Sequence, residues 1–351
     1  MLHSLGDWGD ATGILKNIAT VMTERLDSIE FVIALGDNFY FSGVESVDDP
    51  LWQAVFLKPF NTVPRPFYAV LGNHDWEGNI EAQLRYHDID SRWNMENIYY
   101  RKTFKDGLLE VFFVDTTIMC PIASKSLTGK IFPAPQREEQ YAWLEDAVSN
   151  STATWKFICG HYPVHSNGEN GSTVELRRLE RLMETYRVDA YICGHDHSMQ
   201  HHFNRSTNVH HFVSGAGSST RYFRTYGASK HTMWQSLTGG YLGCDVTETK
   251  ATFEFVSFKG ASLYSYSIDK PVVSAFTFTG PPSQLSVSDH RFIEPHSPAA
   301  AESEDLVVTV SGVSSIDSED GDNNLSQGTV LSLLLDPLGS RAQAEDVPIG
   351  L

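Results

Sequence analysis

The chain has 351 residues, 41% of them apolar, which is enough to bury the core of one large domain or of two smaller ones. Its formal net charge is −18, so its surface repels nucleic-acid phosphates, and we expect no nucleic-acid partner. No run of about 18 apolar residues occurs and no signal peptide is recognisable, so we expect no membrane span.

Short apolar runs that end in glycine recur along the chain and predict strands. They cover residues 31–35, 67–71, 155–159 and 190–193, and a similar run over 111–114 ends at Asp115. Continuous runs rich in aromatic and β-branched residues are typical of strands buried on both faces. Only residues 1–5 precede the first Gly-Asp pair, so either the first strand is short or upstream sequence is missing.

Between these runs, apolar residues recur at helical spacing. They predict helices over residues 14–22, 136–148 and 174–186. Because strands alternate with helices, we expect an α/β layered fold. Ligand sites in such folds lie beyond the carboxyl ends of the strands, so the polar residues that follow the strands should converge there.

The composition changes near residue 270. Residues 250–268 alternate between apolar and polar, which is typical of antiparallel strands. Residues 271–351 contain twelve acidic and two basic residues and are rich in Pro, Ser and Ala. We therefore interpret residues 1–270 as the folded domain and residues 271–351 as an acidic, mostly disordered tail.

Polar residues directly after the predicted strands form five motifs. Each is weak alone, because a Gly-Asp pair is a common turn and a single buried His is more often structural. His195 and His197 are stronger evidence, since alternate residues at a strand end point the same way. The motifs are Gly6-Asp7-Trp8-Gly9, Gly36-Asp37-Asn38-Phe39-Tyr40, Gly72-Asn73-His74-Asp75, Gly160-His161-Tyr162-Pro163 and Gly194-His195-Asp196-His197.

In order and residue type, these motifs resemble those of the metallophosphoesterases. The Gly-Asp-x-Gly and Gly-Asp-x-x-Tyr forms narrow the resemblance to the purple acid phosphatases, in particular the small tartrate-resistant (type 5) enzymes, over about residues 5–268. The resemblance implies a four-layer α/β/β/α sandwich of the calcineurin-like type, with the catalytic domain in residues 1–270. It also implies an acid phosphatase that hydrolyses phosphate monoesters at a dinuclear metal centre.

The family pattern implies seven metal ligands. A ferric ion would be held by Asp7, Asp37, Tyr40 and His197, and a ferrous or zinc ion by Asp37, Asn73, His161 and His195. Asp37 would bridge the two ions. Hard ferric iron suits carboxylate and phenolate oxygens, whereas the softer divalent ion suits imidazole and amide groups. Tyr40 is the most discriminating position, because other metallophosphoesterases place a His ligand where this chain has Gly9.

The resemblance also implies roles around the metals. The nucleophile would be a metal-activated hydroxide, and His74 would give a proton to the leaving alcohol or else orient the ligands. Asn170 stands where the small enzymes have a second active-site His, and it can bind phosphate without supplying a proton. His165 lies nearby in the sequence and is a further candidate for substrate binding, with an ordinary loop His as the alternative.

Two other functions fit the same motifs. One is a related metallophosphoesterase that cleaves diesters, nucleotides or pyrophosphates, and the other is a binding or scaffold protein with an inactive site. Members of the family are usually secreted, lysosomal or vacuolar. Glycosylation sequences, which agree weakly with that location, occur at Asn150, Asn170, Asn204 and Asn324. The sequence does not specify the oligomeric state.

Overall fold

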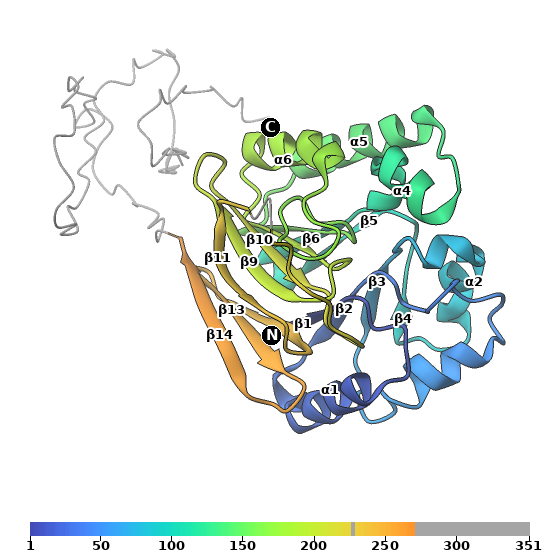
Figure 1. Cartoon of the computed structure of the whole chain (residues 1–351). Coiled ribbons are helices and arrows are strands. Elements are labelled where there is room, and N and C mark those ends of the chain that lie inside the picture. Colours follow the sequence, from blue (N-terminus) through green and yellow to red (C-terminus); the bar gives the residue numbers. More distant parts are fainter. Residues whose placement is uncertain (226–228, 271–351) are drawn as a thin grey trace, which may run out of the picture. The chain divides into compact units, whose positions relative to one another are not determined.

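The computed structural model describes residues 1–225 and 229–270, which form two seven-stranded sheets packed face to face (Figure 1). In spatial order, the first sheet consists of β14 (Ser262–Asp269), β13 (Lys250–Ser257), β12 (Gly240–Val246), β1 (Leu2–Leu5), β2 (Phe31–Leu35), β3 (Phe67–Val70) and β4 (Trp93–Asn94). The second consists of β11 (Thr232–Ser236), β9 (Met199–Asn204), β10 (Val209–Ser214), β8 (Ala190–Cys193), β7 (Trp155–Cys159), β6 (Leu109–Phe113) and β5 (Tyr100–Phe104). The predicted strands are confirmed.

Helices line the outer faces of the sheets (Figure 1). The helices are α1 (Gly13–Glu24), α2 (Ile80–Arg85), α3 (Thr116–Met119), α4 (Pro121–Thr128), α5 (Ala134–Ser149) and α6 (Arg177–Thr185). Thr12 caps α1 by accepting a hydrogen bond from the Leu15 backbone N–H at 3.4 Å, and Ile18 and Met22 are buried one and two turns further on. The three predicted helices are confirmed as α1, α5 and, after a 3₁₀ turn at Val174–Leu176, α6.

Alternate residues of the second sheet face two different cores. Phe157 and Cys159 of β7 belong to the core between the sheets. Ile158 instead packs in a second core that includes Leu144 of α5 and Leu179 of α6. Because side chains of a strand alternate between faces, one sheet is thereby covered on both sides. The expected four-layer α/β/β/α sandwich is confirmed.

Parallel pairing brings several strand ends to one edge of the sandwich. β1, β2 and β3 are mutually parallel neighbours in the first sheet, with Leu5 opposite Ala34 and Leu35 opposite Val70. In the second sheet β6, β7 and β8 are also parallel neighbours. The Gly6 backbone N–H donates to the Ser214 carbonyl at 2.7 Å and so ties the two sheets together at this edge.

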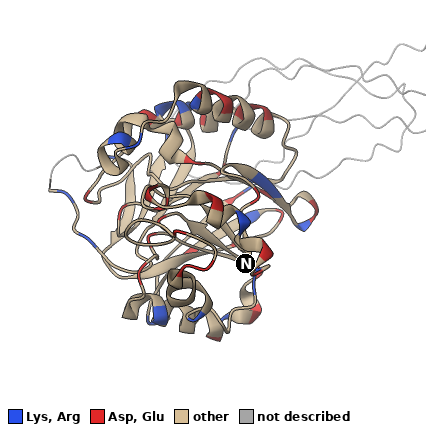
Figure 2. Ribbon diagram, turned by 90° about the vertical axis from the view of Figure 1, so that its right-hand side faces the viewer, with Lys and Arg blue, Asp and Glu red and all other residues tan. Residues whose placement is uncertain are grey.

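The antiparallel strands predicted from the alternating pattern of residues 250–268 are confirmed as β13 and β14, the last strands of the described residues. The predicted tail, residues 271–351, lies outside the described residues. Within the part of the chain that the structure describes, no helix combines the length and apolarity needed to cross a membrane. In the view of Figure 2, Lys and Arg positions are scattered among Asp and Glu positions and form no basic stripe on the described part.

Candidate metal centre

Buried polar side chains from the strand ends of both sheets meet at this edge. Asp7 and Asp37 follow β1 and β2, and His161 and His195 follow β7 and β8. None of these four residues is more than 8% exposed. His161 Nε2 lies 3.4 Å from Asp37 Oδ1, and the His195 backbone N–H donates to Asp7 Oδ2 at 2.7 Å. The fold therefore brings four of the predicted ligands into direct contact.

Tyr40 joins the same cluster. Its hydroxyl oxygen lies 3.0 Å from Asp7 Oδ1, 3.2 Å from Asp37 Oδ2 and 3.1 Å from His197 Nε2. His197 Nδ1 lies 2.7 Å from Ser219 Oγ, so the other ring nitrogen is the one that faces the cluster. The four residues assigned to a ferric ion thus share one small volume.

The donors assigned to a divalent ion include two buried atoms without a hydrogen bond to any described residue. Asn73 Oδ1 and His161 Nε2 make no hydrogen bond within the described residues. His161 Nδ1 donates to the Leu35 carbonyl at 2.8 Å, so Nε2 is the ring nitrogen that faces the cluster. Buried acceptors are rarely left unsatisfied, and a cation between them is the simplest partner.

The charges of the cluster also fit cations. Burial raises the pKa of Asp7 well above its ordinary value, and the neighbouring Asp37 carboxylate adds to that rise. Burial lowers the pKa of His161, but attraction to Asp37 outweighs it and raises that pKa to about 10. The raised pKa values of Asp7 and His161 both mean that the cluster favours binding added positive charge. One ligand atom each from Asp7, Asp37 and His161 lies within 4.8 Å of the others. The donor set therefore fits the implied pair of ions.

The backbone is strained where these ligands are held. Asp7, Asp37 and His195 have φ values of 56°, 49° and 69°, in the left-handed region that non-glycine residues rarely occupy. Such conformations cost about 1–3 kcal/mol each and cluster at functional sites. A Cβ atom on Gly72 would lie 2.2 Å from Asp37 Oδ1, so only glycine permits this approach of the two motif loops.

Two aspartates that the sequence did not single out support the ligand loops. Asp75 Oδ2 accepts the backbone N–H of Gly72 at 2.8 Å and that of Asn38 at 3.1 Å. Asp196 Oδ1 accepts the backbone N–H of Asn170 at 2.8 Å. Both aspartates lie inside the motifs, and this position was the one feature of the sequence that could have identified them. Their roles depend on loops distant in sequence, which the motifs do not position.

His74 stands at the rim of the cluster. Its side chain is 29% exposed, and its Nε2 lies 3.9 Å from Asp37 Oδ2. Its Nδ1 contacts the Phe41 carbonyl, so Nε2 is the nitrogen turned towards the predicted metals. The ring centroid lies 4.8 Å from that of Tyr40. This position, partly exposed and beside the Asp37 carboxylate, is suited to exchanging a proton with a substrate.

The two predicted substrate-binding residues separate in the structure. Asn170 lies beside the cluster, with its Nδ2 donating to the His195 carbonyl at 3.4 Å. His165 is not brought to the cluster, because its Nε2 points at Glu180 Oε1, 2.7 Å away in helix α6. Closeness in sequence was a poor guide here, since the loop after β7 turns between the two positions.

Comparisons with known proteins agree with the geometry. Residues 2–199 match the model of the calcineurin-like phosphoesterase family. The tartrate-resistant acid phosphatase type 5 of Oryctolagus cuniculus is 30% identical over 303 residues, covering 76% of this chain and 90% of that protein. Purple acid phosphatase 7 of Arabidopsis thaliana is 31% identical over 292 residues, covering 76% and 85%.

Among solved structures, GAP50, the anchor in the inner membrane complex of Plasmodium, matches with a TM-score of 0.68. The match covers 76% of this chain and 88% of GAP50, at 24% identity. At that identity the likeness shows a shared fold only.

Proposed function

This chain belongs to the purple acid phosphatases, within the calcineurin-like phosphoesterases, and we propose that it hydrolyses phosphate monoesters at the cluster around Asp37. One observation carries the proposal. The hydroxyl of Tyr40 lies within 3.2 Å of Asp7, Asp37 and His197, which together form the oxygen-rich half of the site. Phenolate and carboxylate oxygens are the donors that hard trivalent iron prefers.

We assign the metal ligands as the resemblance implies. Fe(III) is held by Asp7, Asp37, Tyr40 and His197, and Fe(II) or Zn(II) by Asp37, Asn73, His161 and His195. When bound, such a pair of ions supplies Lewis acidity that activates water and offsets the charge of the phosphate. Binding of the metal ions would displace the protons that the buried carboxyl and imidazole groups carry in their absence.

The protein's own residues provide the remaining chemistry. His74 reaches the site from the exposed rim, and we assign it the transfer of a proton to the leaving alcohol. Asn170, whose side-chain amide lies beside the His195 carbonyl, is placed to donate a hydrogen bond to a phosphate oxygen. We assign no substrate contact to His165, because its side chain is turned to Glu180.

We further propose that the protein works in a secreted, lysosomal or vacuolar location, as expected for this family. Of the glycosylation sequences within the described residues, Asn150 and Asn170 have an exposed Asn, and Asn170 is the one that lies beside the cluster. Asn204 is 7% exposed and its Nδ2 donates to Glu180 Oε1 at 2.7 Å, so it is inaccessible in the folded domain. Glycosylation is therefore expected at Asn150 and not at Asn204.

A scaffold function is the second candidate, because the fold is shared with an anchor protein of Plasmodium. The intact donor set argues against it, since a scaffold has no need of strained, buried ligands. Turnover of a phosphate ester by the metal-loaded protein separates the two functions.

The visible absorption spectrum of the full-length protein tests the proposal. A phenolate bound to ferric iron absorbs broadly in the visible range, so we expect a purple or pink protein that hydrolyses aryl phosphates in mild acid. Tyr40→Phe should lose the colour, whereas Tyr99→Phe, which alters a tyrosine packed on Trp143, should keep it. A colourless wild-type protein that contains two metals would show that Tyr40 is not a ligand.

A further inference from the structure

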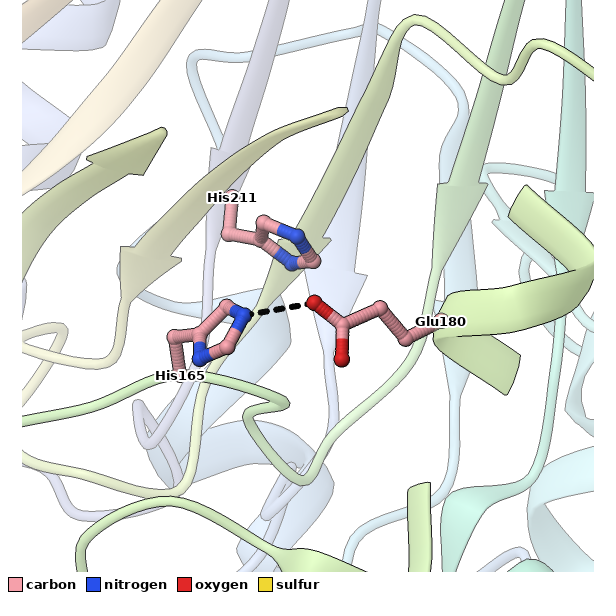
Figure 3. A group of neighbouring side chains, drawn as sticks. All are labelled: His165, Glu180 and His211. Carbon is pink, nitrogen blue, oxygen red and sulfur yellow. Dashed lines mark hydrogen bonds and ion pairs between the residues drawn. The ribbon is translucent and has the colours of Figure 1, made fainter. Parts of the chain in front are cut away.

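A second cluster of histidine and glutamate side chains, which are common metal ligands, lies on the outer face of the second sheet. His211 comes from β10, Glu180 from α6 and His165 from the loop after β7. Figure 3 shows the three side chains pointing toward one another. One ligand atom from each lies within 4.8 Å of the others, and His165 Nε2 is 2.7 Å from Glu180 Oε1. None of these residues belongs to the proposed dinuclear site.

The fold explains how these residues meet. Along β10, Phe212 packs in the core between the sheets, whereas Val209 and Val213 pack in the core below the helices. His211 alternates with Phe212 and therefore faces the helix layer. Glu180 lies on α6, one residue after the buried Leu179, and is only 16% exposed. The helix thus turns a carboxylate toward the sheet.

His211 has no partner to account for its burial. It is 1% exposed, and neither of its ring nitrogens makes a hydrogen bond to any described residue. Its nearest aromatic neighbour is His165, with ring centroids 4.7 Å apart. Burying a polar group without a partner is costly, so native proteins normally supply one. Burial lowers the pKa of His211 well below its ordinary value, so the ring is neutral and one nitrogen keeps a lone pair for a metal.

A purely structural polar cluster explains the site less well. Glu180 Oε1 accepts hydrogen bonds from His165 Nε2 and from Asn204 Nδ2, each at 2.7 Å, so these residues are partly satisfied. His211 gains nothing from that arrangement. Two imidazoles and one carboxylate form a known three-ligand zinc set, in which water or another donor fills the fourth position. His231, whose ring centroid is 4.7 Å from that of His165, adjoins the cluster.

We propose that His165, Glu180 and His211 bind one divalent transition-metal ion of the zinc type, distinct from the dinuclear pair. Such an ion fastens the loop after β7 to helix α6 and to the sheet. That loop begins with His161 and contains Asn170, so the ion holds the substrate side of the dinuclear site in place. Its role is structural, and it takes no part in the hydrolysis itself.

Zinc titration of the full-length protein, with the dinuclear pair already loaded, tests the proposal. Zinc is titrated against a chromogenic chelator, and bound zinc is counted per chain for the wild type, Glu180→Gln and His211→Gln. The matched control is Glu184→Gln, an exposed carboxylate one helical turn further along α6. Thermal melting is measured with and without zinc as a second readout.

We expect the wild type and Glu184→Gln to bind one zinc ion more than the pair and to melt at a higher temperature with zinc. Glu180→Gln and His211→Gln should bind this ion at least about tenfold more weakly, while the visible band of the pair is retained. The proposal is overturned if the wild type binds no additional ion, or if Glu180→Gln binds it as tightly as the wild type does. Should His211→Gln not fold, Glu180→Gln decides, because it keeps the size of a partly exposed side chain.

Discussion

At the scale of single residues, His74 is the group whose role in the reaction is most open to test. It sits at the rim, with Nε2 3.9 Å from Asp37 Oδ2 and Nδ1 against the Phe41 carbonyl. A positioned acid contributes about 10²–10⁴-fold to the rate when the leaving group needs a proton. We therefore expect His74→Ala to lower kcat by that order for alkyl phosphates, and by much less for p-nitrophenyl phosphate.

The control for this variant is His87→Ala, which removes an exposed imidazole from outside the site. His87→Ala should leave kcat unchanged for both the alkyl phosphate and p-nitrophenyl phosphate. Steady-state kinetics on the two esters provide the measurement. Equal losses on both esters would mean that His74 orients the site and donates no proton.

The sequence predicted which residues would gather in the cluster better than it predicted the contacts between them. Asp37 and Tyr40 stand in one motif, and their closeness follows directly from it. The contact of Asp7 with His195 joins residues 188 positions apart, and a motif alone does not fix such a distance. The cluster of His165 with His211 was not predicted at all, because its residues lie on three elements and form no motif.

At the scale of secondary structure elements, β9 and β10 carry a buried pair of imidazoles between the sheets. His201 Nε2 lies 2.9 Å from His210 Nδ1. The titratable side chains that face the pair from β14 are Tyr264 and Tyr266. Burial lowers the pKa of His201 to about 3, with further lowering by His210 and His202, and burial lowers that of His210 to about 4. Both rings are therefore neutral in the folded protein near neutral pH.

This pair should make the domain less stable in acid. An unfolded His binds a proton below about pH 6.5, whereas the folded pair stays neutral down to about pH 4. Because the unfolded state then binds more protons, the free energy of unfolding falls as the pH falls through this window. Each imidazole accounts for about 1–2 kcal/mol between about pH 6.5 and pH 5.

Urea unfolding at both pH values measures this effect. His210→Gln removes one of the two groups, so its unfolding free energy should fall by about 1–2 kcal/mol less than that of the wild type. His87→Gln, at an exposed position, should follow the wild type. If His210→Gln also loses as much stability as the wild type, the buried pair is not a source of acid sensitivity.

Sequence periodicity predicted most elements because burial dictates it. β2 and β7 are buried over nearly their whole length, so their runs of apolar residues are continuous. β9 and β10 are also buried, but they contain four histidines between them, and no apolar run marks them. The histidines satisfy one another or face the helix layer, an arrangement visible only in three dimensions.

At the scale of the whole molecule, the order of the strands could not be read from the chain. β1 lies between β2 and β12, and β12 begins 235 residues after β1 ends. No local pattern encodes that pairing, because it forms only when the last part of the domain returns to the first. The layered architecture was nevertheless expected, since it follows from the alternation of strands and helices alone.

The same closure of the first sheet leads to a prediction about the C-terminal boundary of the catalytic domain. β13 and β14 complete the first sheet, and Lys270 Nζ then forms an ion pair with Asp189 Oδ1 at 2.7 Å and lies 4.4 Å from the Trp155 ring centroid. All the proposed ligands precede this point. We therefore predict that a chain ending at residue 273 folds and keeps its melting temperature and kcat/KM, within about twofold for the latter. Loss of activity with retained folding would show that residues 274–351 contribute to the site, whereas failure to fold would place the domain boundary further along the chain.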